Sequence, residues 1–146
     1  MDDRYWLGEA VAEARRCPPS ATAFSVGAVV VSPDGAELAR GYSREVDEHV
    51  HAEESALAKL GGSAAGATVY SSLEPCSKRK SRPRTCAELI VAAGAARVVF
   101  AWREPAVFVD CHGAEELAAA GLTVVELPEL APLVREVNAH LLDNRS

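Results

Sequence analysis

Apolar residues recur at two different spacings along the chain, and the change from one spacing to the other predicts its helices and strands. Residues 2–16 carry apolar side chains at helical spacing, and Cys17-Pro18-Pro19 ends that helix. Residues 24–43 predict a β-hairpin, because an apolar run leads into the turn residues Pro33-Asp34-Gly35 and a second extended segment follows. The remaining pattern predicts, in order, a helix at 51–62, a strand at 67–73, a helix at 85–94, a strand at 96–102, a helix at 113–121, a strand at 122–127 and a helix from 128 onward.

This order of elements indicates an α/β fold built around one sheet. Helices that alternate with strands cover both faces of a sheet, and a hairpin adds an antiparallel pair to it. We therefore expect a three-layer α/β/α sandwich with a mixed five-stranded sheet. The 146 residues are enough for one hydrophobic core, and no repeat or linker divides them, so residues 1–146 are predicted to form a single domain.

The composition limits the classes of partner. The chain has 21 Asp and Glu against 15 Lys and Arg, a formal net charge of −6, which argues against binding to nucleic acid or to an anionic membrane. The longest apolar run, "LIVAAGAARVVFAW", contains Arg97 and is too short to cross a bilayer, and the first residues do not resemble a signal peptide. We predict a cytoplasmic protein, in which the four cysteines are thiols or metal ligands rather than disulfides.

Three side chains in separate segments are candidate metal ligands. His51, Cys76 and Cys86 are each predicted to lie where a loop enters a helix. One imidazole and two thiolates suit tetrahedral zinc and leave the fourth position open. Glu53 follows His51 by two residues at the start of a helix, where its carboxylate can face the same site and move a proton.

A His-x-Glu motif followed by Pro-Cys and a second cysteine is typical of zinc-dependent deaminases of nucleobases. "HAEESAL", "SSLEPCS" and "CAELIVAAGAARVV" together resemble the deaminase domain of the riboflavin-biosynthesis RibD (RibG) family, and the resemblance extends from "YWLGEAVAEA" to "VNAHLL". It implies a cytidine deaminase-like fold, with zinc held by His51, Cys76 and Cys86 and with Glu53 as the proton shuttle. The implied reaction is hydrolytic removal of an amino group from a diaminopyrimidinone ribotide, a small pyrimidine nucleotide.

The chain departs from that family at positions that contact substrate. The family has Asn-Pro-Asn where this chain has Ala23-Phe24-Ser25, and a histidine where it has Lys78. The substrate therefore stays open, with cytosine or dCMP, guanine and a secondary-metabolite pyrimidine as alternatives. A different alternative is a non-catalytic zinc-stabilised interaction module, which requires a fourth protein ligand. The candidates for that ligand are His49, Cys111 and His112.

Basic residues gather between the two candidate cysteine ligands, where they suit a phosphate group. A solvated charged loop is the alternative for each of them. The predicted substrate-binding residues are Ser25, Gly27, His49, Glu74, Lys78, Arg82 and Arg84. A tight sheet contact for Gly27 and a loop-orienting role for Glu74 are equally open, and an ordinary surface or capping position is the favoured interpretation of His49. The resemblance also implies a homo-oligomer, which we expect to be a dimer formed through the C-terminal helix or residues 103–112.

Overall fold

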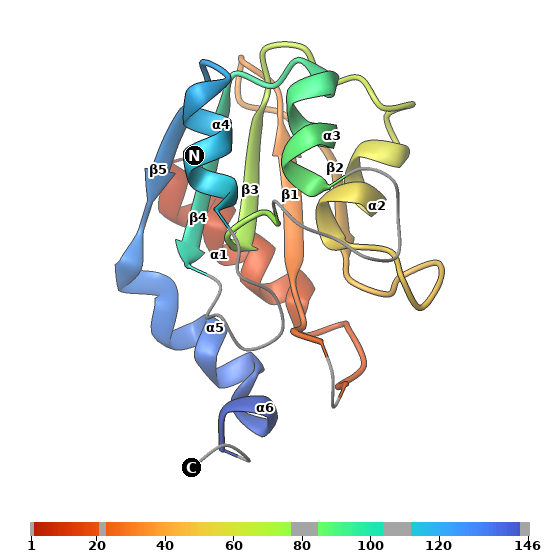
Figure 1. The fold of residues 1–146 in the computed structure, drawn as a ribbon, viewed down its shortest axis with the longest axis vertical. Helices are drawn as coiled ribbons and strands as arrows, with labels where there is room; N and C mark the ends of the chain where they lie inside the picture. The colour runs from red at the N-terminus through yellow and green to blue at the C-terminus, as the bar shows by residue number, and fades with distance from the viewer. Residues whose placement is uncertain (1, 21–22, 77–84, 104–111, 144–146) are drawn as a thin grey trace.

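The computed structural model describes residues 2–20, 23–76, 85–103 and 112–143, and it describes the backbone alone at 142 and 143. One sheet runs through the molecule in the order β2-β1-β3-β4-β5 (Figure 1). β1 is antiparallel to both β2 and β3, whereas β3, β4 and β5 are parallel. The strands are β1 (Gly27–Val31), β2 (Glu37–Tyr42), β3 (Thr68–Leu73), β4 (Arg97–Trp102) and β5 (Thr123–Glu126). The predicted mixed five-stranded sheet is confirmed.

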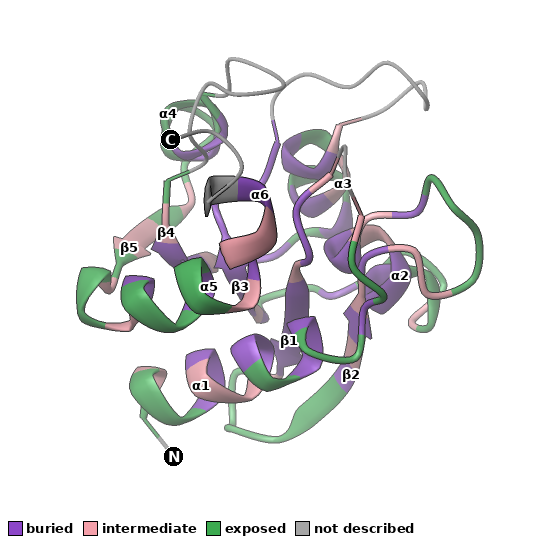
Figure 2. Ribbon diagram, turned by 90° about the horizontal axis from the view of Figure 1, so that it is seen from below, coloured by how far each residue is buried: buried purple, intermediate pink, exposed green. Residues whose placement is uncertain are grey.

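Helices cover both faces of this sheet, as the pattern predicted. One face carries α2, α3 and α4, which we call the site face, and the other carries α1, α5 and α6, which we call the scaffold face (Figures 1 and 2). The helices are α1 (Asp3–Ala14), α2 (Ala52–Ala58), α3 (Cys86–Ala93), α4 (Gly113–Ala119), α5 (Ala131–Val137) and α6 (Ala139–Asp143), with a 3₁₀ turn η1 (Pro128–Leu130) before α5.

Strand position explains the apolar pattern. All of β1 is buried, because it lies between two strands and under helices on both faces, and its run of valines follows from that burial. Ala28 and Val30 pack on the site face, whereas Val29 and Val31 pack on the scaffold face. β2 and β5 are the edge strands and retain exposed residues at their ends.

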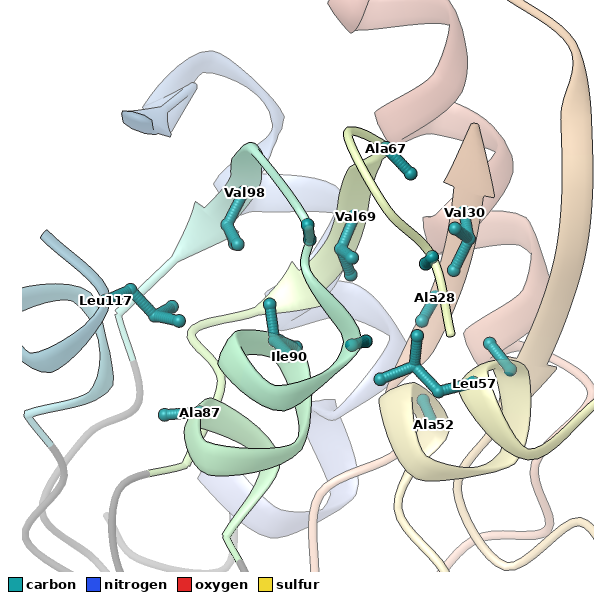
Figure 3. Packing of buried hydrophobic residues seen from close by; sticks show 14 residues of the cluster. Ala28, Val30, Ala52, Leu57, Ala67, Val69, Ala87, Ile90, Val98 and Leu117 are labelled. Carbon is teal, nitrogen blue, oxygen red and sulfur yellow. The ribbon is translucent and has the colours of Figure 1, made fainter. Parts of the chain in front are cut away.

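The two faces have different cores. Small aliphatic side chains dominate the site face, where Leu57, Ile90 and Leu117 are the largest buried ones (Figure 3). The scaffold face instead buries aromatic rings, with Trp6 and Tyr70 among the buried residues. In the part of the chain that the structure describes, we find no helix with the length and apolarity needed to span a membrane.

Gly27 shows how closely α1 approaches the sheet. A Cβ at this position would lie 1.9 Å from the Ala10 carbonyl oxygen and 2.5 Å from the Ala14 nitrogen. Only glycine allows the helix backbone to pack so tightly against β1. The structure thus accounts for Gly27 by packing, and its predicted contact with substrate stays a prediction.

Two helices end earlier than their patterns predicted. α2 stops at Ala58 instead of continuing to 62, since the Gly62 N–H donates to the Leu57 carbonyl (2.9 Å) and closes the helix. The C-terminal helix is interrupted at Asn138, which separates α5 from α6. The Asn138 side chain bonds the backbone of Ser25 as well as Val134, so a tertiary contact fixes the position of the break.

Candidate active site

The three candidate ligands lie at the ends of elements on the site face. His51 is the N-cap residue of α2, and Cys76 follows the C-terminal end of β3 after Pro75. Cys86 is the first residue of α3, whose N-terminus is closed by reciprocal hydrogen bonds between Thr85 and Glu88. The neighbouring helices α2 and α3 therefore bring residues that are far apart in sequence to one place.

The geometry of these side chains fits a zinc ion. Their ligand atoms all lie within 4.8 Å of one another. His51 Nδ1 is 3.2 Å from Cys86 Sγ and 3.5 Å from Cys76 Sγ. Tetrahedral zinc with ordinary bond lengths separates nitrogen and sulfur ligands by about 3.6 Å. Within residues 2–20, 23–76, 85–103 and 112–143 this is the one such group, and it contains no fourth protein ligand.

The surroundings of Cys76 favour a thiolate. Its sulfur accepts a hydrogen bond from the Cys86 backbone N–H at 3.3 Å. Hydrogen bonding from the Cys86 side chain, followed by that from His51, lowers the pKa of Cys76 to about 4, against the opposing effect of burial. A thiolate is the form that binds zinc, so the polypeptide already stabilises the ligand state of this residue.

Glu53 lies buried beside the ligands, with 3% of its surface exposed. Burial raises the pKa of its carboxyl group, and the negative charge of Cys76 raises it further, while His51 acts in the opposite direction. The side chain accepts a hydrogen bond from Ser71 Oγ at 3.1 Å. Ser71 was not among the predicted site residues, although two adjacent serines in an otherwise apolar strand were a signal for buried polar contacts.

Glu74 supports the turn that carries Cys76. Its buried carboxylate accepts a hydrogen bond from the Ala114 N–H at 3.0 Å and lies 3.5 Å from Arg103 Nη1. A Cβ on Gly113 would lie 1.7 Å from the Pro75 carbonyl oxygen, so the start of α4 packs directly on this turn. These contacts fit the loop-orienting interpretation of Glu74, and neither Gly113 nor Arg103 was predicted.

Ser25 lies buried at the start of the segment that leads into β1. Its N–H donates to Asn138 Oδ1 (2.7 Å), and Asn138 Nδ2 donates to its carbonyl (3.1 Å). Arg44 has a left-handed backbone (φ 61°), unusual outside glycine, and its guanidinium donates to the Pro18 carbonyl (2.8 Å) and Cys17 Sγ (2.9 Å) and lies 3.5 Å from Ser25 Oγ. Backbone and side-chain contacts thus fix this segment from two sides.

The other predicted residues are placed differently. His49 is exposed, with its ring 3.4 Å from the Glu48 carboxylate. His112 is the exposed N-cap residue of α4. The predicted phosphate contacts and one candidate fourth ligand lie outside the described residues, namely Lys78, Arg82, Arg84 and Cys111. Substrate binding by any of these residues stays a prediction.

Comparisons with known proteins agree with this geometry. The family model described as "Cytidine and deoxycytidylate deaminase zinc-binding region" matches residues 1–102. The diaminohydroxyphosphoribosylamino-pyrimidine deaminase of Schizosaccharomyces pombe is 43% identical over 129 residues, which are 85% of this chain and 31% of that protein. The chain spans about a third of the length of the first curated relatives that it matches.

Solved structures of two relatives have the same fold. RibD of Acinetobacter baumannii is 32% identical, with a TM-score of 0.80 over 97% of this chain and 39% of that chain. The Rib2 deaminase of Aspergillus oryzae, crystallised as a C-terminal deletion mutant in complex with DARIPP, is 25% identical. It superposes with a TM-score of 0.84 over 98% of this chain and 93% of that chain. The predicted three-layer fold is confirmed by these superpositions.

Proposed function

The chain belongs to the cytidine and deoxycytidylate deaminase zinc-binding family, and on this premise we propose that it is a zinc-dependent deaminase of a pyrimidine ribotide. The observation that carries the proposal is the convergence of His51, Cys76 and Cys86, with the buried Glu53 in electrostatic contact with that group. The reaction consumes one water and releases one ammonia, since a C–O bond forms at the amino-bearing carbon and the C–N bond breaks.

His51, Cys76 and Cys86 would hold the zinc ion of the family's His/Cys/Cys site. A zinc ion bound there supplies Lewis-acid activation of water at neutral pH. Two thiolates and one imidazole leave a coordination position open, and no fourth ligand joins them among the residues that the structure describes. A catalytic zinc site keeps such a position open, whereas a structural zinc module would be closed by a fourth protein ligand, and Cys111, one candidate for that ligand, lies outside the described residues.

Glu53 is the group that would move protons. It lies at the start of α2, where its carboxylate is buried away from solvent and interacts electrostatically with Cys76 and His51. Burial raises the pKa of the Glu53 carboxyl group. A carboxyl group with a raised pKa is suited both to accept a proton and to return it. In the proposed cycle Glu53 takes a proton from the attacking water and delivers it to the amino group that leaves as ammonia.

A ribotide is the substrate favoured by the relatives. The Schizosaccharomyces pombe relative is a diaminohydroxyphosphoribosylamino-pyrimidine deaminase, and the Aspergillus oryzae relative was crystallised with DARIPP, a pyrimidine ribotide. The basic residues of the loop between the cysteine ligands supply positive charge suited to a phosphate. These observations support a role in riboflavin biosynthesis, as a deaminase of the diaminopyrimidinone ribotide.

Ammonia release from the zinc-loaded protein tests the proposal. The substrates would be DARIPP, CMP, dCMP, cytidine, guanine and adenosine, each measured with the wild-type protein and with Glu53→Gln. We expect turnover of DARIPP alone and its loss in the variant. Turnover of a different compound would overturn the substrate, and a zinc-loaded protein that acts on none of them would favour the non-catalytic module.

Three further predictions stand beside this function. A single deaminase domain over residues 1–146, a homodimer and a cytoplasmic location all derive from the sequence and its resemblance to the RibD family. Sedimentation velocity at several protein concentrations would test the dimer. A sedimentation coefficient that stays at the value of the 15.4 kDa monomer would contradict it.

A further inference from the structure

Ser71 is a fully buried polar residue in the central part of the sheet, next to the proposed proton shuttle. It belongs to β3, it is 0% exposed, and its hydroxyl oxygen lies 3.1 Å from Glu53 Oε2 and 2.7 Å from the Leu73 carbonyl oxygen. We propose that Ser71 is a positioning residue that holds the Glu53 carboxylate in place during proton transfer. This inference rests on the proposed deaminase function and deepens it.

The burial of both groups makes the contact important. A carboxylate removed from water needs hydrogen-bond partners, and leaving it without them is costly. Ser71 reaches Glu53 from β3, the central strand, so its contact joins the helix that carries the shuttle to the centre of the sheet. Because Ser71 has no exposed surface, it can act on the reaction only through residues that it contacts, such as Glu53, and not through direct contact with substrate.

A hydroxyl group suits a partner that gains and loses a proton. Ser71 Oγ–H can donate to the ionised carboxylate of Glu53. When Glu53 carries the proton, the carboxylic acid can donate to Ser71 Oγ, whose own proton then goes to the Leu73 carbonyl. The carboxyl group therefore keeps a hydrogen bond to Ser71 in both halves of a proton-transfer cycle, without moving.

Ser72 provides a matched control on the same strand. It is also 0% exposed, and its hydroxyl oxygen accepts a hydrogen bond from the Gly27 N–H at 3.0 Å. Adjacent residues of a strand point to opposite faces of the sheet, so Ser72 points away from Glu53. Ser71→Ala and Ser72→Ala each remove one buried hydroxyl from the same strand, but only the first removes a contact with the shuttle.

The first test is steady-state kinetics of the zinc-loaded protein with DARIPP. For Ser71→Ala we expect kcat to fall at least about tenfold with KM within a factor of about two, because positioning of a proton-transfer group is lost while substrate contacts persist. Ser71→Thr keeps the hydroxyl and should recover most of kcat, and Ser72→Ala should keep kcat even if it lowers the stability. Equal kcat values for the two alanine variants would overturn the proposal.

The second test reads the contact without relying on catalysis. A double-mutant cycle joins wild type, Ser71→Ala, Glu53→Ala and the double variant, with urea unfolding measured at a fixed zinc concentration. We expect the equilibrium constants of unfolding to show a coupling of at least about fivefold for this pair and none for Ser72 with Glu53. Additive effects for Ser71 and Glu53 would overturn the inference, whereas a coupled pair in a protein that releases no ammonia would overturn the proposed function alone.

Discussion

The site face and the scaffold face of the sheet use buried polar groups for different purposes. On the site face, His51, Glu53, Cys76 and Cys86 gather at one edge of a core of small aliphatic residues. On the scaffold face, polar groups join segments that are distant in the sequence, as Asn138 does when it bonds both backbone groups of Ser25.

The site face therefore holds the residues proposed for the reaction, and the scaffold face holds contacts that stabilise the fold. Helices α2 and α3 approach the sheet over small side chains, so the residues at their N-termini meet the end of β3. The helices of the scaffold face pack on aromatic rings and are held to the rest of the fold by hydrogen bonds and ion pairs. Polar substitutions on the site face should therefore reduce activity, and those on the scaffold face should reduce stability.

The largest effect is expected for Glu53→Gln. The amide has the shape of the carboxyl group but cannot accept and return a proton, so ammonia release should fall by a factor of about 10² to 10⁴. Zinc content and the urea midpoint should stay close to those of the wild-type protein, because the ligands are intact. Metal analysis, urea unfolding and the ammonia assay on the same preparation measure all of this.

Glu54→Gln, one position further along α2, is the matched control. Glu54 accepts a hydrogen bond from the His51 N–H, and the amide oxygen of glutamine can replace that acceptor. Its activity should stay near that of the wild-type protein. Equal losses in the two variants would mean that charge at the start of α2, rather than proton transfer by Glu53, is what the reaction needs.

The next effect concerns the backbone of the site face. Gly113→Ala places a methyl group where the Pro75 carbonyl lies, so α4 has to move away from the turn that carries Cys76. We expect a loss of about 3 kcal/mol in the free energy of unfolding, together with weaker zinc binding. Gly8→Ala in α1 is the control, since open space surrounds this position, and alanine there should stabilise the protein by about 0.5–1 kcal/mol. If Gly113→Ala binds zinc as tightly as the wild-type protein, the packing of α4 on this turn does not contribute to the metal site.

A third substitution tests the scaffold face. Asn138→Ala removes both hydrogen bonds to Ser25 and leaves its backbone N–H and carbonyl without these partners in a buried position. The free energy of unfolding should fall by about 2 kcal/mol, with zinc content unchanged. A variant that unfolds like the wild-type protein but loses its zinc would contradict the separation of the two faces.

Local signals explain why the centre of the site could be predicted from the sequence. Pro75 lies just beyond the end of β3 and immediately before Cys76, and Thr85 with Glu88 marks the start of the helix that begins with Cys86. Each ligand is thus fixed by its neighbours in the sequence, and only their convergence requires the fold. The order of helices and strands was predictable for the same reason, since each element has its own apolar period and its own end signals.

Contacts between distant residues explain what the sequence could not reveal. Asn138 and Ser25 are 113 positions apart, and the sequence around either residue gives no signal that the two are in contact. The hydrogen bond from Ser71 to Glu53 depends on where the fold places the start of α2 relative to β3. For the same reason, helical periodicity extended the C-terminal helix through Asn138, where the tertiary contact with Ser25 interrupts it.

The smallest expected effect concerns the Asp3 carboxylate on the scaffold face, which accepts hydrogen bonds from Arg97 Nη2 (2.9 Å) and from the Tyr70 hydroxyl (2.6 Å). The bond from Arg97 lowers the pKa of Asp3 below its ordinary value of 3.8, so its contribution to stability is present above about pH 4 and is lost as the pH falls through the lowered pKa. Asp3→Asn should therefore lower the free energy of unfolding by about 1 kcal/mol at pH 7, and the difference from wild type should shrink below pH 4 in urea unfolding.

Glu129→Gln, which breaks the more exposed pair with Arg4, is the control. Its smaller effect on the free energy of unfolding should disappear in 1 M salt, where that of Asp3→Asn persists. A difference between Asp3→Asn and wild type that is constant from pH 7 to pH 2 would show that the charge of Asp3 does not stabilise the scaffold face.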